Sequence, residues 1–142
     1  MIIFILIFAA TTTQAREINR RYLKIGLIKY GKTVEHISKQ NNIDYLLVVA
    51  LICYENHTWN AKAKSSTGDL GLMQIHSNDT SFLNAGKNLK YGIKKLANLI
   101  KKFGFVDGIE AYNKGSAGMR RIKTRIYAKE IIKFYHKLKE RK

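Results

Sequence analysis

A run of ten apolar residues, from Tyr45 to Tyr54, constrains the fold more than any other feature of this sequence. Asp44 precedes the run and can cap a helix, because its side chain can accept a hydrogen bond from a backbone N–H of the first turn. A helix that is apolar on every side must be buried on every side. The sequence therefore predicts a central core helix over 45–54, with Glu55 emerging at its C-terminal end.

The rest of the chain predicts further helices around this central one and little β-structure. Residues 56–78 are rich in Asn, Ser, Thr and Gly, a composition typical of a loop or a short hairpin. Helix signals recur on both sides of that segment. The expected helices cover 17–41, as one or two segments broken near Gly31; 88–103, with Gly104 as the cap; a short segment through Ala111; and about 124–139, with an apolar stripe of Tyr127, Ile131, Phe134 and Leu138.

Length and composition predict one mainly α-helical domain. A chain of 142 residues can bury a core without disulfides or metals, and it has no proline, linker or internal repeat. Its single cysteine, Cys53, lies in the apolar run and is expected to be a small buried residue. We therefore expect residues 16–142 to form one domain with one active site.

The first fifteen residues, MIIFILIFAATTTQA, have the pattern of an export signal. An apolar stretch precedes Thr13-Gln14-Ala15, an ending that suits signal peptidase, and the stretch is too short to cross a bilayer comfortably. The usual positive residues before the stretch are absent, and basic residues begin only at Arg16. We expect cleaved export, with an uncleaved membrane tether or an unexported, phage-encoded protein as the alternatives.

Basic residues outnumber acidic ones by 26 to 10, which gives a formal net charge of +16. A positive field favours nucleic acid, anionic lipid or the acidic polymers of a bacterial wall. On the last expected helix, Lys129, Lys133 and Lys137 share a face that is either solvated or binds anions. No nucleic-acid-binding motif accompanies the charge, so binding of nucleic acid or membrane is kept only as an alternative function.

Glu55 stands at the boundary of the predicted core. Partial desolvation penalises the charged form of a carboxyl group and raises its pKa. A glutamate that stays protonated near neutral pH can donate a proton to a leaving oxygen. The simpler interpretation, a glutamate in a surface salt bridge, is weakened by the ten apolar residues that precede it.

Four stretches occur in an informative order: Glu55-Asn56, GLMQI at 71–75, AYNKG at 111–115 and TRIYAKEI at 124–131. In that order they resemble the motifs of the lytic transglycosylase family, and the resemblance covers about residues 34–136. It implies a lysozyme-like, mainly α-helical domain with a glycan-binding groove and at most a small β-hairpin. The sequence looks most like the small specialised transglycosylases of secretion and conjugation systems, and phage lysins also use this domain. A secretion or conjugation apparatus, or a phage particle, is therefore an expected partner.

The resemblance implies an enzyme that cuts the β-1,4 bond between N-acetylmuramic acid and N-acetylglucosamine in peptidoglycan glycan strands. In this family one glutamate makes both proton transfers, and it maps onto Glu55. It would protonate the glycosidic oxygen and then take a proton from the muramic C6 hydroxyl, which closes a 1,6-anhydro ring. Such an enzyme needs no cofactor or metal and is expected to be a monomer in the periplasm or at the cell wall, held there by its basic face.

The family motifs also imply roles for their other residues. Gln74 and Met73 would line the groove near the cleaved bond, and Gly71 would let the backbone come close to sugar. Tyr112 and Asn113 would contact the sugar and its acetamido group.

Four further residues complete the expected site. Tyr127 would donate a hydrogen bond to Glu55, or would belong only to the core. Asn56 replaces the serine usual after the catalytic glutamate and would hydrogen-bond substrate in a similar way. Lys114 is expected to point outward. Trp59 is either a sugar-stacking platform or, as we favour, a lid on the core.

Asp69 raises a different possibility. The pattern Asp69-x-Gly71-x-x-Gln74 resembles the segment of animal-type lysozymes that carries their second catalytic carboxylate. Retaining glycosidases hold two carboxyls roughly 5 to 5.5 Å apart and inverting ones roughly 6.5 to 9.5 Å apart, and the sequence spacing permits either. We favour Asp69 as a loop-stabilising residue, and keep as the alternative a muramidase that hydrolyses the same bond with Glu55 and Asp69.

Overall fold

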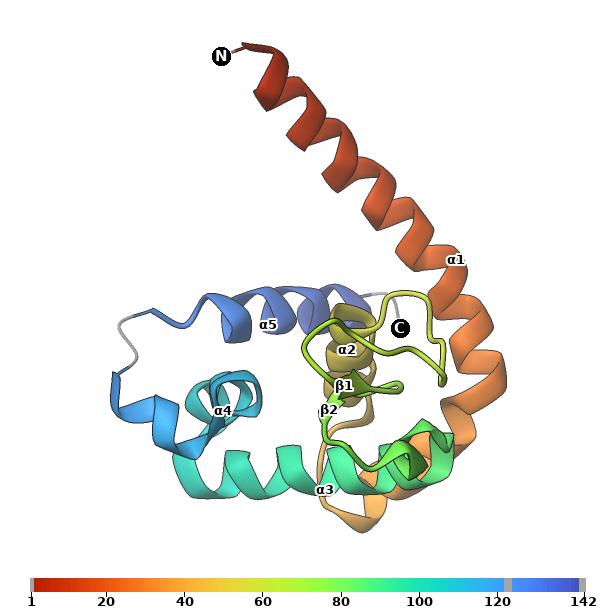
Figure 1. Cartoon of the computed structure of the whole chain (residues 1–142), viewed down its shortest axis with the longest axis vertical. Helices are drawn as coiled ribbons and strands as arrows, with labels where there is room; N and C mark the ends of the chain where they lie inside the picture. Colours follow the sequence, from red (N-terminus) through yellow and green to blue (C-terminus); the bar gives the residue numbers. More distant parts are fainter. Residues whose placement is uncertain (1, 122–123, 141–142) are drawn as a thin grey trace.

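Five helices and one small hairpin make up the described part of the chain (Figure 1). The computed structural model describes the backbone of residues 2–121 and 124–140 and the side chains of residues 20–120 and 124–140. The expected mainly α-helical fold with a small β-hairpin is confirmed. In chain order the elements are α1 (Ile2–Gln40), α2 (Tyr45–Glu55), β1 (Asp69–Leu70), β2 (Ile75–His76), the 3-10 turn η1 (Thr80–Leu83), α3 (Ala85–Phe103), α4 (Phe105–Gly118), the 3-10 turn η2 (Met119–Arg121) and α5 (Ile126–Lys139).

The expected central helix is α2, which lies between the other helices in Figure 1. Asp44 caps it as predicted, because its carboxylate accepts a hydrogen bond from the backbone N–H of Leu46 at 2.8 Å. Every residue from Leu47 to Cys53 is buried. Burying a large apolar side chain stabilises the fold by about 1.5–3 kcal/mol, so this segment anchors the core. Burial also raises the pKa of the Cys53 thiol to about 12, as fits a small apolar role.

α1 differs from expectation, because it runs through Gly31 without a break. Gly26 and Gly31 both lie on its buried face. A Cβ at Gly26 would come within 2.1 Å of the Trp59 ring, and one at Gly31 within 3.4 Å of the Tyr45 hydroxyl. Close packing therefore offsets the roughly 1 kcal/mol that glycine costs in a helix. Trp59 is only 4% exposed and stacks on Tyr30, which confirms its place in the core and excludes the sugar platform.

No helix within the described segments combines the length and apolar character that a membrane span requires. In Figure 1 the first half of α1 extends away from the other helices.

α3 and α4 pack closely around a glycine contact. Gly104 has a φ of 86° and closes α3 by donating its N–H to the Ile100 carbonyl at 2.8 Å, so the predicted cap is confirmed. A Cβ at Gly108 would lie 2.4 Å from the Ile100 Cα, which explains why a glycine stands at this crossing. α4 continues beyond the expected end at Ala111 and kinks at Gly115, whose φ is 74°.

α5 touches α2 at both ends. At the C-terminal end of α2, the Tyr127 hydroxyl donates to Glu55; at the N-terminal end, the Tyr135 hydroxyl donates to Asp44 at 2.8 Å. Tyr127 and Ile131 are buried, as the expected stripe requires. The three lysines of the opposite face, Lys129, Lys133 and Lys137, are exposed. The helix therefore buries one face on α2 and presents a basic face to solvent.

Candidate active site

Glu55 is the last residue of α2 and lies half-buried at the surface of the core. Burial raises the pKa of its carboxyl group, and the nearby charge of Asp69 raises it further. A hydrogen bond from Tyr127 and the positive charge of Lys95 act in the opposite direction, but burial prevails. The predicted upward shift is thus confirmed, and this carboxyl group is suited to donate a proton.

Tyr127 belongs both to the core and to the site. Its hydroxyl donates to Glu55 Oε1, while its ring is 7% exposed and meets Tyr54 edge-on at 5.2 Å. Burial and the adjacent Glu55 raise the pKa of Tyr127, so its hydroxyl remains a proton-bearing donor. Tyr127 is therefore both a core residue and the hydrogen-bond donor to Glu55, and its packed ring holds the hydroxyl in place.

The GLMQI segment forms a tight turn between β1 and β2, which pair antiparallel. Gly71 has a φ of 75° and Gln74 a φ of 47°, an uncommon conformation for a residue with a side chain. The Gln74 amide turns back and donates to the Gly71 carbonyl at 2.8 Å. A Cβ at Gly71 would meet Asn88 Nδ2 at 2.4 Å. The contact with Asn88 thus explains why a glycine stands at position 71, and the expected approach of its backbone to sugar stays a prediction.

Asn88, a residue outside the family motifs, holds this turn in place. It is fully buried on α3. Its Oδ1 accepts from the Met73 N–H at 2.8 Å, and its Nδ2 donates to the carbonyls of Leu70 at 2.7 Å and Phe82 at 2.9 Å. Its position indicates burial, because Asn88 lies on the same buried face of α3 as Gly92.

Three residues that the motifs assign to the substrate-binding groove have buried side chains. Asn56 is buried and donates to the carbonyls of Asn60 at 2.8 Å and Gly71 at 3.0 Å. Met73 is fully buried, and Tyr112 is 5% exposed with its hydroxyl donating to the Met73 carbonyl at 2.8 Å. The Asn56 amide and the Tyr112 hydroxyl therefore already have hydrogen-bond partners inside the protein.

The other assigned side chains are accessible. Asn113, one residue after Tyr112, is exposed, and so is Lys114, as expected. Gln74 is half-buried. The amides of Gln74 and Asn113 are therefore the assigned polar groups that remain open to a ligand.

Asp69 is held by polar neighbours from its own hairpin. Its Oδ2 accepts from Ser65 Oγ at 2.8 Å and Thr67 Oγ1 at 2.6 Å, and its Oδ1 lies 3.1 Å from His76 Nδ1. Burial acts to raise the pKa of Asp69, but these hydrogen bonds outweigh it and the pKa is lowered. The pKa values of the two carboxyls are thus displaced in opposite directions, Glu55 upward and Asp69 downward.

Lys95 is a second residue near the site that lies outside the family motifs. It is half-buried on α3, with its ammonium 4.6 Å from the centre of the Tyr112 ring and 3.5 Å from the Tyr112 carbonyl. Burial lowers its pKa, whereas the charges of Glu55 and Asp69 raise it. Lys95 therefore places a cation within electrostatic reach of both carboxyls. Nothing in the sequence separates it from exposed Lys94.

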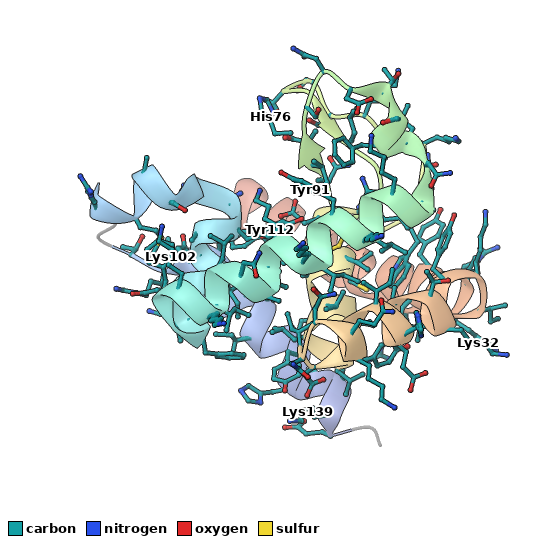
Figure 2. The ribbon with its side chains drawn as sticks, turned by 90° about the horizontal axis from the view of Figure 1, so that it is seen from below. Lys32, His76, Tyr91, Lys102, Tyr112 and Lys139 are labelled. Carbon is teal, nitrogen blue, oxygen red and sulfur yellow. The ribbon has the colours of Figure 1, made fainter. Side chains whose placement is uncertain are left out.

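The side of α3 next to the hairpin also presents an aromatic ring. Tyr91, one helical turn before Lys95, is 50% exposed and meets Phe82 edge-on at 5.0 Å. Figure 2 shows Tyr91 beside α3 toward the hairpin that carries His76, with Tyr112 near the same helix. Among the side chains described, those of residues 20–120 and 124–140, no cluster of three or more His, Cys, Asp or Glu could hold a metal ion.

Replacing Lys95 by Met should raise the pKa of Glu55. The ammonium favours the ionised carboxylate, so its removal makes ionisation harder and moves the pKa upward. The measurement is a pH titration of the Glu55 carboxyl by ¹³C NMR. Lys94→Met is the matched control and should leave that pKa unchanged. An unchanged or lowered Glu55 pKa in Lys95→Met would contradict the assignment.

A family model described as "Transglycosylase SLT domain" matches residues 32–135. The matched segment is more than half of the chain and runs from the C-terminal part of α1 into α5. It contains Glu55, Asp69, the GLMQI turn, the AYNKG segment and Tyr127.

Proposed function

Since the chain belongs to the transglycosylase SLT domain family and is an enzyme that acts on peptidoglycan, we propose that Glu55 makes both proton transfers of a lytic transglycosylase. The bond cleaved is the β-1,4 linkage between N-acetylmuramic acid and N-acetylglucosamine. The observation that carries the proposal is a half-buried carboxyl with a raised pKa, at the end of a rigid core helix and hydrogen-bonded by Tyr127. This is the environment that a general acid requires near neutral pH.

In the first step protonated Glu55 gives its proton to the glycosidic oxygen. The bond from muramic C1 to that oxygen breaks, and its electron pair stays on the departing N-acetylglucosamine. Positive charge then develops at the muramic ring. Asp69, whose lowered pKa keeps it ionised, is close enough to raise the pKa of Glu55 and would also stabilise this charge.

In the second step the ionised Glu55 takes the proton of the muramic C6 hydroxyl. The C6 oxygen bonds to C1 and closes the 1,6-anhydro ring, which returns Glu55 to its protonated state without consuming water. Tyr127 donates to the same carboxyl throughout and keeps it oriented. The accessible amides of Gln74 and Asn113 would bind the sugars, because each supplies both a donor and an acceptor.

A hydrolytic muramidase is the second candidate. The opposite pKa displacements of Glu55 and Asp69 favour it, because a protonated acid beside an ionised carboxylate is the pattern of two-carboxylate glycosidases. In that mechanism Asp69 would act as nucleophile or would activate a water. Its three hydrogen bonds within the hairpin support the non-reacting role instead, since they occupy both of its oxygens.

Asp69→Asn separates the two mechanisms. For a transglycosylase we expect kcat to stay within about tenfold of wild type, because only a nearby charge is lost. For a two-carboxylate hydrolase the loss should be on the order of 10²–10⁴-fold. Asp79→Asn is the matched control, since Asp79 is exposed and pairs with Lys87. Mass spectrometry of the wild-type products should show 1,6-anhydro ends; reducing ends would overturn the proposed transglycosylase reaction.

We also propose that residues 1–15 direct export, so that the enzyme works in the periplasm or at the wall. The apolar stretch ending in Thr13-Gln14-Ala15 supports this. The exposed lysines of α5 would hold the enzyme on an anionic wall or lipid surface. A secretion or conjugation apparatus, or a phage particle, would be the setting in which it opens the wall.

A further inference from the structure

The helix that carries Tyr127 lacks a cap of its own. α5 follows Arg125, whose side chain makes no capping hydrogen bond. The first backbone N–H groups of any helix have no partner within the helix. One of them belongs to Ala128, which is fully buried and shielded from water. An unpaired N–H at that position would be costly, so its partner matters.

The partner is Glu110 on α4. Glu110 is 2% exposed, and its Oε2 accepts from the Ala128 N–H at 2.8 Å. Burial of a carboxyl group is expensive unless it is hydrogen-bonded, and the positive end of a helix is a favourable place for one. One turn earlier on α4, Asp107 pairs with the Arg125 guanidinium, with a second contact at 3.3 Å. Two carboxylates of α4 thus hold the first turn of α5.

We propose that Glu110 is a positioning residue for the catalytic carboxyl, acting through α5 and Tyr127; this inference rests on the proposed function of Glu55. The path consists of two hydrogen bonds joined by one peptide bond. Glu110 fixes the Ala128 N–H, Ala128 is the chain neighbour of Tyr127, and the Tyr127 hydroxyl donates to Glu55 Oε1. Because the ring of Tyr127 is packed, a shift of the first turn of α5 moves the hydroxyl with it.

The same carboxylate links two parts of the site. Glu110 immediately precedes the AYNKG segment, so α4 carries both the residue that fixes α5 and the exposed Asn113. Tyr112 of that segment donates to the Met73 carbonyl in the GLMQI turn. The contact with the GLMQI turn and the contact with α5 therefore come from the same part of α4, before its kink at Gly115.

A purely structural cap can be distinguished from a positioning residue through the pKa of Glu55. Among the described residues, the groups that act on this pKa are Tyr127, Asp69 and Lys95, and Glu110 is not one of them. Tyr127 lowers the Glu55 pKa by its hydrogen bond. Loss of Glu110 should thus raise the Glu55 pKa only if it displaces Tyr127.

The test uses the full chain with Glu110→Ala, Glu110→Gln, Tyr127→Phe and the double variant Glu110→Ala/Tyr127→Phe. We expect Glu110→Ala to lower kcat on soluble glycan strands about tenfold with little change in KM, because small misplacements of catalytic groups cost rate. Its Glu55 pKa, followed by ¹³C NMR and by the basic limb of the pH–rate profile, should rise as in Tyr127→Phe. The double variant should resemble Tyr127→Phe alone, since both changes break one path. Glu110→Gln should recover most of the loss, because its amide oxygen can accept from the Ala128 N–H.

Val34→Ala is the control for lost stability, because Val34 is buried on α1 and belongs to neither α4 nor α5. It should lower the melting temperature without moving the Glu55 pKa. If Glu110→Ala does not fold, the same measurements are made on Glu110→Asp, whose shorter side chain keeps a carboxyl group but moves its oxygen away from the Ala128 N–H. A folded variant with wild-type kcat and wild-type Glu55 pKa would overturn the inference. Wild-type protein that does not cleave glycan strands would instead overturn the proposed function, and the NMR titration would still decide the role of Glu110.

Discussion

Glu55→Gln should lower kcat on purified peptidoglycan by about a thousandfold or more, while the protein stays folded. The amide has nearly the same shape and can still accept from Tyr127, but it neither gives nor takes a proton. Turbidity loss of a peptidoglycan suspension measures the rate. Glu35→Gln is the matched control, because Glu35 is an exposed glutamate on α1, and it should keep wild-type activity. Residual activity near wild type in Glu55→Gln would remove Glu55 from the mechanism.

The same variant tests the environment of the carboxyl group. Folding raises the pKa of Glu55, so its contribution to stability is fully present below the unfolded pKa and is lost as pH rises through the folded pKa. At neutral pH the wild type must keep this group protonated or bury a charge. Thermal unfolding should therefore show Glu55→Gln to be at least as stable as wild type at pH 7, with the difference disappearing in acid.

Asn88→Ala should destabilise the protein by about 3 kcal/mol or more. It leaves one buried N–H and two carbonyls without their partner, and each unsatisfied group costs about 1–3 kcal/mol. Since domains of this size are stable by only about 5–15 kcal/mol, the loss is a large part of the total. Urea unfolding measures the change, and activity should fall with it because the GLMQI turn loses its anchor.

Asn98→Ala provides the comparison for Asn88, because Asn98 is an exposed asparagine on the same helix. A change of only a few tenths of a kcal/mol is expected there. Asn88→Asp should not rescue the fold, since a carboxylate cannot donate to the carbonyls of Leu70 and Phe82. Equal unfolding midpoints for Asn88→Ala and Asn98→Ala would show that the turn is held by other contacts.

The elements with a strong local pattern could be predicted from the sequence. Ten consecutive apolar residues behind Asp44 allow only a buried helix, and its end places Glu55 at the core boundary. The stripe that includes Tyr127 and Ile131 predicts the buried face of α5 in the same way. The break near Gly31 was wrong, because the benefit of packing a glycine against Tyr45 is not visible in local sequence.

The directions of the site side chains could not be predicted. A motif match names positions, but Asn56, Met73 and Tyr112 turn inward because their partners come from distant parts of the chain. Asn88 and Glu110 each hydrogen-bond a backbone N–H about 15 to 18 residues away in sequence. The pKa of Lys95 is raised by Glu55 and Asp69, which lie on other elements. Such contacts depend on how the helices pack, which no local periodicity encodes.

The two tyrosine contacts of α5 bear on when the enzyme becomes active during its synthesis. α5 is the last helix in chain order, and its Tyr127 and Tyr135 reach opposite ends of α2. Earlier segments leave the ribosome first and can begin to fold without it. Until α5 docks, Glu55 has no hydroxyl to orient it, even though the groove motifs are already present. Under the proposed function, a chain clipped before α5 would lack this hydrogen bond to Glu55 and should therefore cleave peptidoglycan more slowly than the full chain.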